Sequence, residues 1–152
     1  MSNLNTDIHD RVVNRAAMTR LYERKMHDQI ETVVGSHEVR IQKTIENSKL
    51  NRKKLNPELD REYERFEKQL YAKSSAGLID LGKNQISFAF QNVQMGVGKL
   101  FNLEPPSQKV ATEFVLKDKL VDNKTLEAGW AGVSKAERVR LEQVIRKGIS
   151  EG

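Results

Sequence analysis

The chain has 152 residues, of which 38% are hydrophobic and 31% are charged, and its formal net charge is +5. Because the apolar share is below that of ordinary globular domains, we expect long helices that bury narrow stripes in place of one spherical core. The chain contains no cysteine, which excludes disulfides, thiolate metal sites and cysteine nucleophiles.

The sequence shows no sign of a membrane-spanning segment or a secretion signal. It holds no apolar run close to the roughly 20 residues that a membrane-spanning helix needs. Residues 1–7 lack the basic and then apolar order of a signal peptide. We therefore expect a protein that does not span a membrane and does not follow the general secretion route.

Residues 1–73 predict a long helical hairpin. Apolar residues recur every four positions behind a cap at Thr6 or Asp7, and Gly35-Ser36 is the first break that we expect in this helix. The polar and basic stretch 46–56 is typical of a turn between two antiparallel helices. The residues that we expect in the helical seams are Ile8, Val12, Tyr22, Met26, Ile30, Leu59, Tyr63, Phe66 and Leu70.

Asn56-Pro57 predicts the start of the second helix. Asparagine is a favoured N-cap, and proline suits the first helical position because its missing N–H would have no helical partner there. Glu58 and Asp60 then complement the helix dipole. We expect a heptad-like apolar stripe from Leu59 onward.

Residues 74–104 form a charge-poor segment with several glycines. The alternation of Ile86, Phe88 and Phe90 is compatible with a short strand, but the apolar period continues for longer than a typical strand. We therefore expect a helix over most of this segment. Its apolar face is either part of the core or a surface where another subunit docks, and we favour the docking surface because the overall apolar content of the chain is low.

Gly96-Val-Gly-Lys99 partly matches a phosphate-binding loop. The full motif also needs a glycine and a serine or threonine, where this chain has Val93 and Leu100. We therefore interpret these small residues as a means of close helix packing.

Residues 105–152 predict a small helical region that follows the break at Glu104-Pro105-Pro106. Ser107 caps a short helix carrying Val110 and Phe114, with Leu120 as its farthest candidate, and residues 122–124 form a turn. Ser134–Glu137 has the pattern of a capping box, so we expect the last helix to start there and to end in a left-handed Gly148.

The sequence does not contain catalytic or metal-binding residues at the spacing that known motifs require. His9, His27 and His37 stand too far apart in sequence for the two-histidine metal pair of one helix face. The carboxylates of residues 58–67 alternate with lysines and arginines, which is typical of a solvated helix face. We predict no catalytic residue, no metal or cofactor and no small-molecule ligand.

Two groups of residues are candidates for contacts with other molecules. The densest basic cluster, residues 49–54, is either a solvated turn, which we favour, or a weak, salt-sensitive contact with DNA through Arg52, Lys53 and Lys54. The candidates for partner contact are apolar side chains in or beyond the charge-poor segment: Ile86, Phe90, Val93, Phe101 and Trp130.

The end of the chain resembles a known family. The phrase Ile145-Arg-Lys-Gly-Ile-Ser-Glu-Gly152, after Gly129-Trp-Ala-Gly-Val-Ser134, is similar to the closing helix of the Mu F-like head-morphogenesis family of tailed-phage minor head proteins. In that family the phrase leads into a further helix, and this sequence departs from the pattern there. The resemblance implies a protein at the portal vertex, in the virion or host cytoplasm, that acts in head assembly or is carried with the genome.

The sequence thus predicts a mainly α protein: an elongated helical hairpin or bundle with a small helical C-terminal part. Its predicted regions are 1–73, 74–104 and 105–152. The leading interpretation is a non-enzymatic assembly protein of a phage-like particle, whose partners are subunits of a portal or capsid-like ring, or copies of itself. The alternatives are a helical protein that binds nucleic acid non-specifically and a cellular coiled-coil adaptor.

Overall fold

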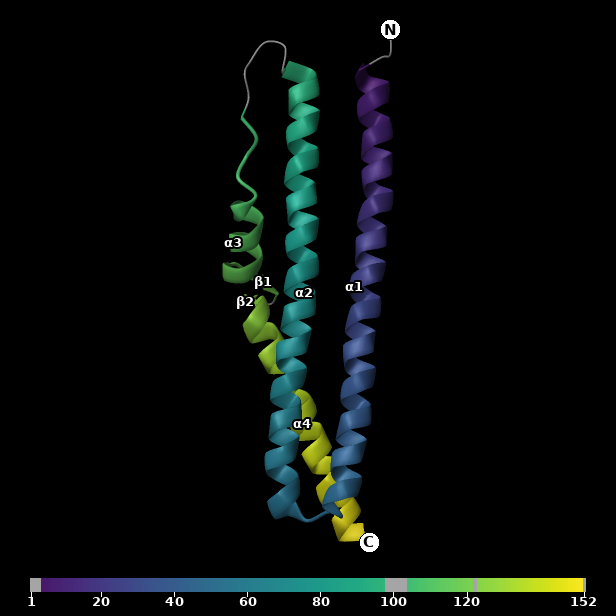
Figure 1. Ribbon diagram of the computed structural model, residues 1–152, viewed down its shortest axis with the longest axis vertical. Coiled ribbons are helices and arrows are strands. Elements are labelled where there is room, and N and C mark those ends of the chain that lie inside the picture. The colour runs from purple at the N-terminus through teal and green to yellow at the C-terminus, as the bar shows by residue number, and fades with distance from the viewer. Residues whose placement is uncertain (1–3, 98–103, 122, 152) are drawn as a thin grey trace.

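The molecule is mainly α-helical and elongated (Figure 1). The computed structural model describes residues 4–97, 104–121 and 123–151, without the side chains of residues 4, 5, 8, 121 and 151. Helices α1 (Leu4–Ser48) and α2 (Arg52–Val97) form a long antiparallel hairpin. The short helix α3 (Lys109–Lys117), the strands β1 (Lys119–Val121) and β2 (Lys124–Thr125), and the helix α4 (Leu126–Glu151) return along its side.

The turn of the hairpin lies inside residues 46–56, as predicted. Lys49 and Leu50 adopt positive φ angles of 48° and 59°, and Asn51 then caps α2 because its Oδ1 accepts a hydrogen bond from the Lys53 N–H at 3.1 Å. The predicted helix start at Asn56-Pro57 is therefore wrong. Pro57 lies inside α2, in a turn that the fully buried Leu55 holds against the core.

Helix α1 continues through Gly35-Ser36, so the break predicted there is wrong. Val33 and His37, on either side of the glycine, are both buried against α2, and this packing outweighs the low helix propensity of glycine. The helix predicted for the charge-poor segment is confirmed as far as Val97. The predicted boundary between residues 73 and 74 consequently falls in the middle of α2.

The apolar core lies in the half of the hairpin next to its turn. The seam predicted around Leu59 is confirmed, whereas Val12 is 51% exposed and is not part of the seam. The side chain of Ile8 lies outside the described residues. Near the N-terminus α1 contacts α2 through polar side chains, and Val12 is therefore not buried between the two helices. The buried core cluster consists of Val33, Ile41, Leu55, Leu59, Tyr63, Phe66 and Leu70.

Polar contacts replace the apolar seam near the N-terminus. Arg11 donates from Nε to Asn92 Oδ1 at 2.9 Å and from Nη2 to Gln91 Oε1 at 2.8 Å. The guanidinium groups of Arg11 and Arg15 stand 5.7 and 5.6 Å from the centre of the Phe88 ring. At the end of the hairpin away from its turn, these contacts hold α1 on α2. The described residues form no buried apolar cluster there.

Helix α3 packs on α2 through a close backbone approach. A Cβ atom at Gly82 would stand 3.0 Å from the Cβ of Ala111, so a larger residue there would push α3 outward by a few tenths of an ångström. By contrast, a Cβ at Gly96 would meet nothing within 4 Å among the described residues, so the structure shows no close packing at this glycine, and Gly98 lies outside the described residues. The short helix after Ser107 is confirmed, but Leu120 belongs to β1 and not to this helix.

The strands β1 and β2 pair antiparallel across a turn in which Asn123 has a φ of 59°. The turn predicted at residues 122–124 is confirmed at Asn123, while residue 122 lies outside the described residues and Lys124 is the first residue of β2. Helix α4 begins directly after it, and Thr125 Oγ1 accepts a hydrogen bond from the Ala128 N–H at 3.3 Å. The helix start predicted at Ser134 is therefore wrong, because an earlier cap is available.

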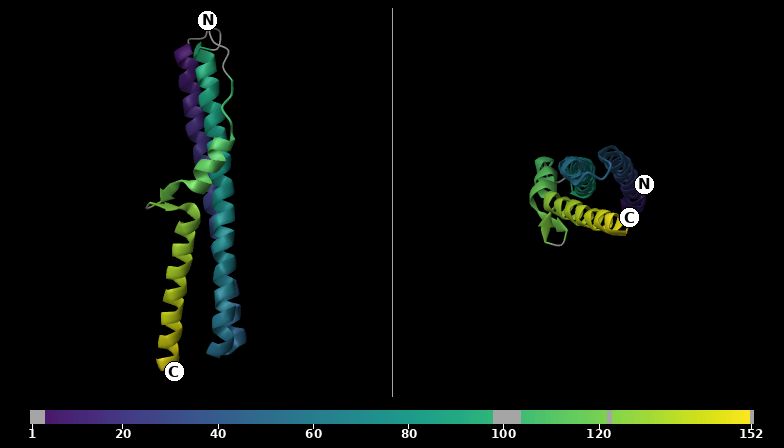
Figure 2. Two further views of the ribbon diagram at one scale, coloured as in Figure 1. Left: turned by 90° about the vertical axis from the view of Figure 1, so that its left-hand side faces the viewer. Right: turned by 90° about the horizontal axis from the view of Figure 1, so that it is seen from below.

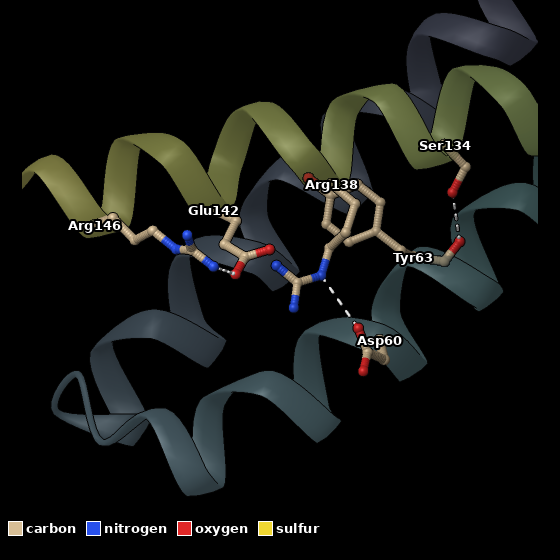
Figure 3. Close-up of polar contacts among 6 residues, drawn as sticks. All are labelled: Asp60, Tyr63, Ser134, Arg138, Glu142 and Arg146. Carbon is tan, nitrogen blue, oxygen red and sulfur yellow. Dashed lines mark hydrogen bonds and ion pairs between the residues drawn. The ribbon is translucent and has the colours of Figure 1, made fainter.

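Figure 3 shows how α4 is held on α2. Ser134 lies within the helix and its Oγ donates to the Tyr63 carbonyl oxygen at 3.2 Å, while Arg138 Nε donates to Asp60 Oδ1 at 3.2 Å. The helix continues past Gly148, and none of the described glycines has a positive φ, so the predicted left-handed end is wrong. None of the described helices is long and apolar enough to cross a bilayer.

Candidate interaction surface

An apolar groove lies where α3 meets the last turns of α2. Its volume is about 380 Å³. Figure 2 shows α3 alongside α2, in the half of the molecule that holds the N-terminus. We call this groove and the adjoining Phe114 the α2–α3 surface. The groove is lined by Ile86, Ala89, Phe90 and Val93 of α2 and by Glu104, Pro106 and Val110 of the segment that enters α3.

The α2–α3 surface exposes apolar side chains that α3 has no means of burying. Ala111 and Val115, four residues apart, pack against α2 and are each only 4% exposed. Val110 and Phe114 form a second pair with the same spacing, on a different part of the helix, and are 57% and 54% exposed. A nine-residue helix with two apolar stripes buries one in this fold, and the other remains open to a partner.

The described border of the groove is mainly polar. Gln108 donates from Nε2 to Ser87 Oγ at 3.3 Å, and Gln91, which accepts a hydrogen bond from Arg11, lies nearby with Gln94 in an adjoining depression. Among the residues that the structure describes, Glu104 is the one ionisable side chain that lines the groove itself. A low charge around exposed apolar side chains reduces the desolvation cost of docking, as in the centres of protein–protein interfaces.

The structure brings three of the five predicted partner-contact residues together. Ile86 and Phe90 are partly buried and Val93 is 53% exposed, and all three line the groove. Phe101 lies outside the described residues. Trp130 lies elsewhere, in the contact between α4 and α2.

Trp130 fastens α4 to α2 within the chain. Its indole Nε1–H donates to Ser74 Oγ at 2.7 Å, and that hydroxyl donates in turn to the Leu70 carbonyl oxygen at 2.8 Å. The ring is partly buried against the core cluster. A tryptophan with a satisfied N–H and a packed ring is typical of an internal anchor.

Sequence reasoning missed the contribution of α3 to the surface. Val110 and Phe114 were expected in a short helix, and their spacing of four was visible. Nothing local distinguishes that pair from Ala111 and Val115, which have the same spacing. The packing of α3 on α2, with Ala111 against Gly82, decides which pair faces outward.

The basic cluster lies at the opposite end of the hairpin. Arg52, Lys53 and Lys54 are exposed in the first turn of α2. The C-terminal part of α4 reaches the same end of the molecule (Figure 1), and Arg146 lines a small pocket together with Arg52. Arg146 also donates to Glu142 at 2.6 Å, and this hydrogen bond lowers the pKa of the Glu142 carboxyl.

His37 is packed more deeply than the sequence indicated. It is only 4% exposed, its ring stacks on Phe66 at 4.0 Å and its edge contact with Tyr63 is at 4.7 Å. Neither ring nitrogen has a hydrogen-bond partner among the described residues. Burial, with a further contribution from the nearby Arg40, lowers the pKa of His37 to about 4. The imidazole is therefore neutral near pH 7.

One exposed group of side chains has metal-ligand chemistry. The ligand atoms of His27, Asp28 and Glu31 all lie within 4.8 Å of one another on the outside of α1. All three side chains are open to solvent. Solvated acidic groups of this kind are common on helix surfaces and need no ion to explain them.

No family model, curated protein or solved structure matches this chain. The resemblance to the Mu F-like family therefore stays a prediction. The described residues of the phrase that carries it, 145–151, continue α4 without a break.

Proposed function

We propose that this chain is a non-enzymatic assembly protein that docks on another protein subunit through the α2–α3 surface. The observation that carries this proposal is the exposure of Val93 and Val110, which line one groove, and of Phe114, which lies four residues after Val110 on α3. Two packed helices hold these side chains in place, so docking costs little conformational entropy.

The elongated hairpin suits a protein that reaches from one component to another. Helix α1 has 45 residues, and at 1.5 Å per residue it is about 67 Å long. The α2–α3 surface lies in the half of the hairpin away from the turn, and the core that stabilises the fold lies in the other half. A partner therefore gains access to the surface without displacing the core.

The setting that we propose is the head or portal vertex of a phage-like particle, in the virion or the host cytoplasm. The resemblance of Ile145–Gly152 to tailed-phage minor head proteins supports this setting. The partner would be a portal or capsid-like ring subunit with an exposed apolar patch of its own. Full burial of each valine or phenylalanine contributes about 1.5–3 kcal/mol before the costs of association.

The double substitution V110S/F114S tests the docking surface. We expect it to weaken binding to purified portal rings or head shells of the particle by at least about a hundredfold, because two exposed anchors are lost at once. Co-sedimentation with those assemblies measures the effect. Helix content and thermal stability should stay unchanged, since both side chains are exposed.

Val139→Ser is the matched control, because Val139 is 46% exposed on α4, away from the groove. Binding by this variant should equal that of the native chain. If V110S/F114S bound the rings as tightly as the native chain, the α2–α3 surface would not be the docking site.

A second candidate function, weak and non-specific DNA contact, uses the other end of the hairpin. It is favoured by the convergence of Arg146 with Arg52, Lys53 and Lys54 at that end. Such binding should fall steeply with salt, and the triple variant R52A/K53A/K54A should reduce the salt slope by about 3. A salt series of DNA-binding measurements on both proteins checks this; an unchanged slope excludes the site.

A further inference from the structure

A second apolar groove lies between α1 and α4, close to the turn of the hairpin. Its volume is about 560 Å³. We call it the α1–α4 groove. Its Val144 is 67% exposed, the highest value among the large hydrophobic side chains described as exposed. The apolar residues that line it are Ile41 and Ile45 of α1, Tyr63 of α2, and Leu141 and Val144 of α4.

The groove resembles the position that a further helix occupies in a helix bundle. Helix α4 is fixed to α2 by Trp130, Ser134 and Arg138, and the view from below shows it lying across the hairpin (Figure 2). Its outer apolar residues therefore face a channel beside α1. In a four-helix bundle such a channel holds the fourth helix, packed by apolar side chains from two neighbours.

The rim of the groove is acidic, although the chain as a whole is basic. Glu38 and Glu46 stand exposed on the α1 side and Glu137 on the α4 side. Among the described lining residues Arg140 is the only arginine or lysine, and it pairs with Glu137 at 3.8 Å. An occupant should therefore carry apolar side chains flanked by arginine or lysine.

The N-terminal half of α1 has this chemistry. Val13, Ala17 and Leu21 follow one another at steps of four, and all three are exposed, with values of 55% for Val13 and 57% for Leu21. Arg20 and Arg24 flank the stripe and are exposed as well. The face is apolar and basic, which complements an apolar groove with an acidic rim.

The apolar stripe of residues 13–24 and the α1 side of the groove lie on the same helix. Two antiparallel copies of α1 related by a twofold axis can therefore place each stripe against the groove of the other copy. In two antiparallel copies of α1 related by an axis between residues 29 and 30, position 21 lies opposite position 38. Positions 17 and 13 then lie opposite positions 42 and 46. Arg20 and Arg24 of one copy flank Glu38 of the other, and both contacts form at once because the arrangement is symmetric.

We propose that two copies of this chain pair antiparallel, each placing residues 13–24 of α1 in the α1–α4 groove of the other. The α2–α3 surface stays free, because α3 lies on the far side of α2 from α1 (Figure 1). The dimer thus carries one docking surface toward each end. This inference goes beyond the proposed function, and neither depends on the other.

A charge exchange tests the pairing. The variant R20E/R24E has an acidic stripe and an acidic groove, and E38K/E46K has a basic stripe and a basic groove. Each variant alone should lose dimerisation by about a hundredfold or more, since like charges meet at both contacts. An equimolar mixture should restore a heterodimer, because opposite charges then meet at both contacts. Sedimentation equilibrium measures the mass against that of the 17.4 kDa chain.

The control for charge reversal is R61E/R65E, which changes two exposed arginines four residues apart on α2. It should dimerise like the native chain. Circular dichroism of every variant checks that the helices are intact. A native chain that stays monomeric across the concentration series overturns the proposal, as does a mixture of the two exchanged variants that stays monomeric.

The register is tested by cross-linking, for which the absence of cysteine is an advantage. In the variant A17C/Q42C the two positions lie 25 residues apart on one helix, about 37 Å, too far for a disulfide within the chain. Mild oxidation should therefore give a covalent dimer. The pair A17C/R61C should not, and equal cross-linking of both pairs would contradict the proposed register.

Discussion

The two halves of the hairpin are held together by different physical means. Next to the turn, α1, α2 and α4 enclose seven buried side chains, from Val33 to Leu70. In the other half no described residue of α1 before Val33 is buried, and arginines reach across to Phe88, Gln91 and Asn92. The buried core cluster thus holds the helices together in one half, and polar contacts between α1 and α2 do so in the other.

The largest expected effect is the loss of a core leucine. Leu59 is 0% exposed, whereas Val12 is 51% exposed. Leu59→Ala should lower the free energy of unfolding by about 3 kcal/mol or more, through lost burial and a cavity. Val12→Ala should change it by less than about 0.5 kcal/mol. Urea denaturation compares the two, and similar losses would contradict the division into halves.

The next effect is a pH dependence that belongs to the half with the core. Because the pKa of His37 is lowered from 6.5 to about 4, the unfolded chain binds more protons than the folded chain between these values. Its contribution is complete above pH 6.5 and is lost as the pH falls toward 4, by about 3 kcal/mol in total. Denaturation at a series of pH values measures it.

His37→Phe is the matched variant, since it keeps an aromatic ring against Phe66. Its stability should lose the part of the pH dependence between 6.5 and 4. The exposed His9 and His27 remain in both proteins. An identical pH profile for the variant would show that another group causes the dependence.

A smaller effect is expected from the polar half. Arg11→Ala removes two hydrogen bonds and one contact with the Phe88 ring. We expect a loss of about 1–2 kcal/mol or less, because these groups exchange their contacts for water. Hydrogen exchange should show faster opening of residues near the N-terminus and unchanged protection around Leu59. Equal loss of protection in both halves would contradict their independence.

The smallest effect is expected for an exposed ion pair. Lys68 donates to Glu64 at 2.6 Å on the outside of α2, and both side chains are more than half exposed. Lys68→Ala should leave the melting temperature without measurable change, although the pair stands beside the core, because solvent screens it. A clear drop in melting temperature would show that an exposed ion pair contributes to stability when it lies next to core residues.

Local residue chemistry and periodicity account for the correct predictions of fold. The apolar spacing around Leu59 and Phe66 was sufficient for the core seam, and the polar stretch 46–56 was sufficient for the turn. The helix starts were less predictable. Asn56 and Ser134 are good caps that the chain does not use, because Asn51 and Thr125 lie earlier and cap first.

The sequence predicted the α2 side of the candidate surface but not its α3 side. Ile86, Phe90 and Val93 stood out in a charge-poor segment, but Val110 and Phe114 had no local sign of their role. Trp130 was as conspicuous in sequence as Phe90, and it packs inside the chain on Ser74. Whether an apolar residue faces a core or a partner depends on neighbours that are distant in sequence.

The sequence by itself determined the helical class, the hairpin turn and the part of the core seam from Leu59 to Leu70, because the apolar period is a local property. Tertiary structure decided which end of the hairpin carries the core, which face of α3 is open and where α4 lies. Those features depend on one close approach at Gly82 and on contacts such as Ser134 with Tyr63, which join residues far apart in the chain. No local pattern contains that information, because it arises only when the helices pack.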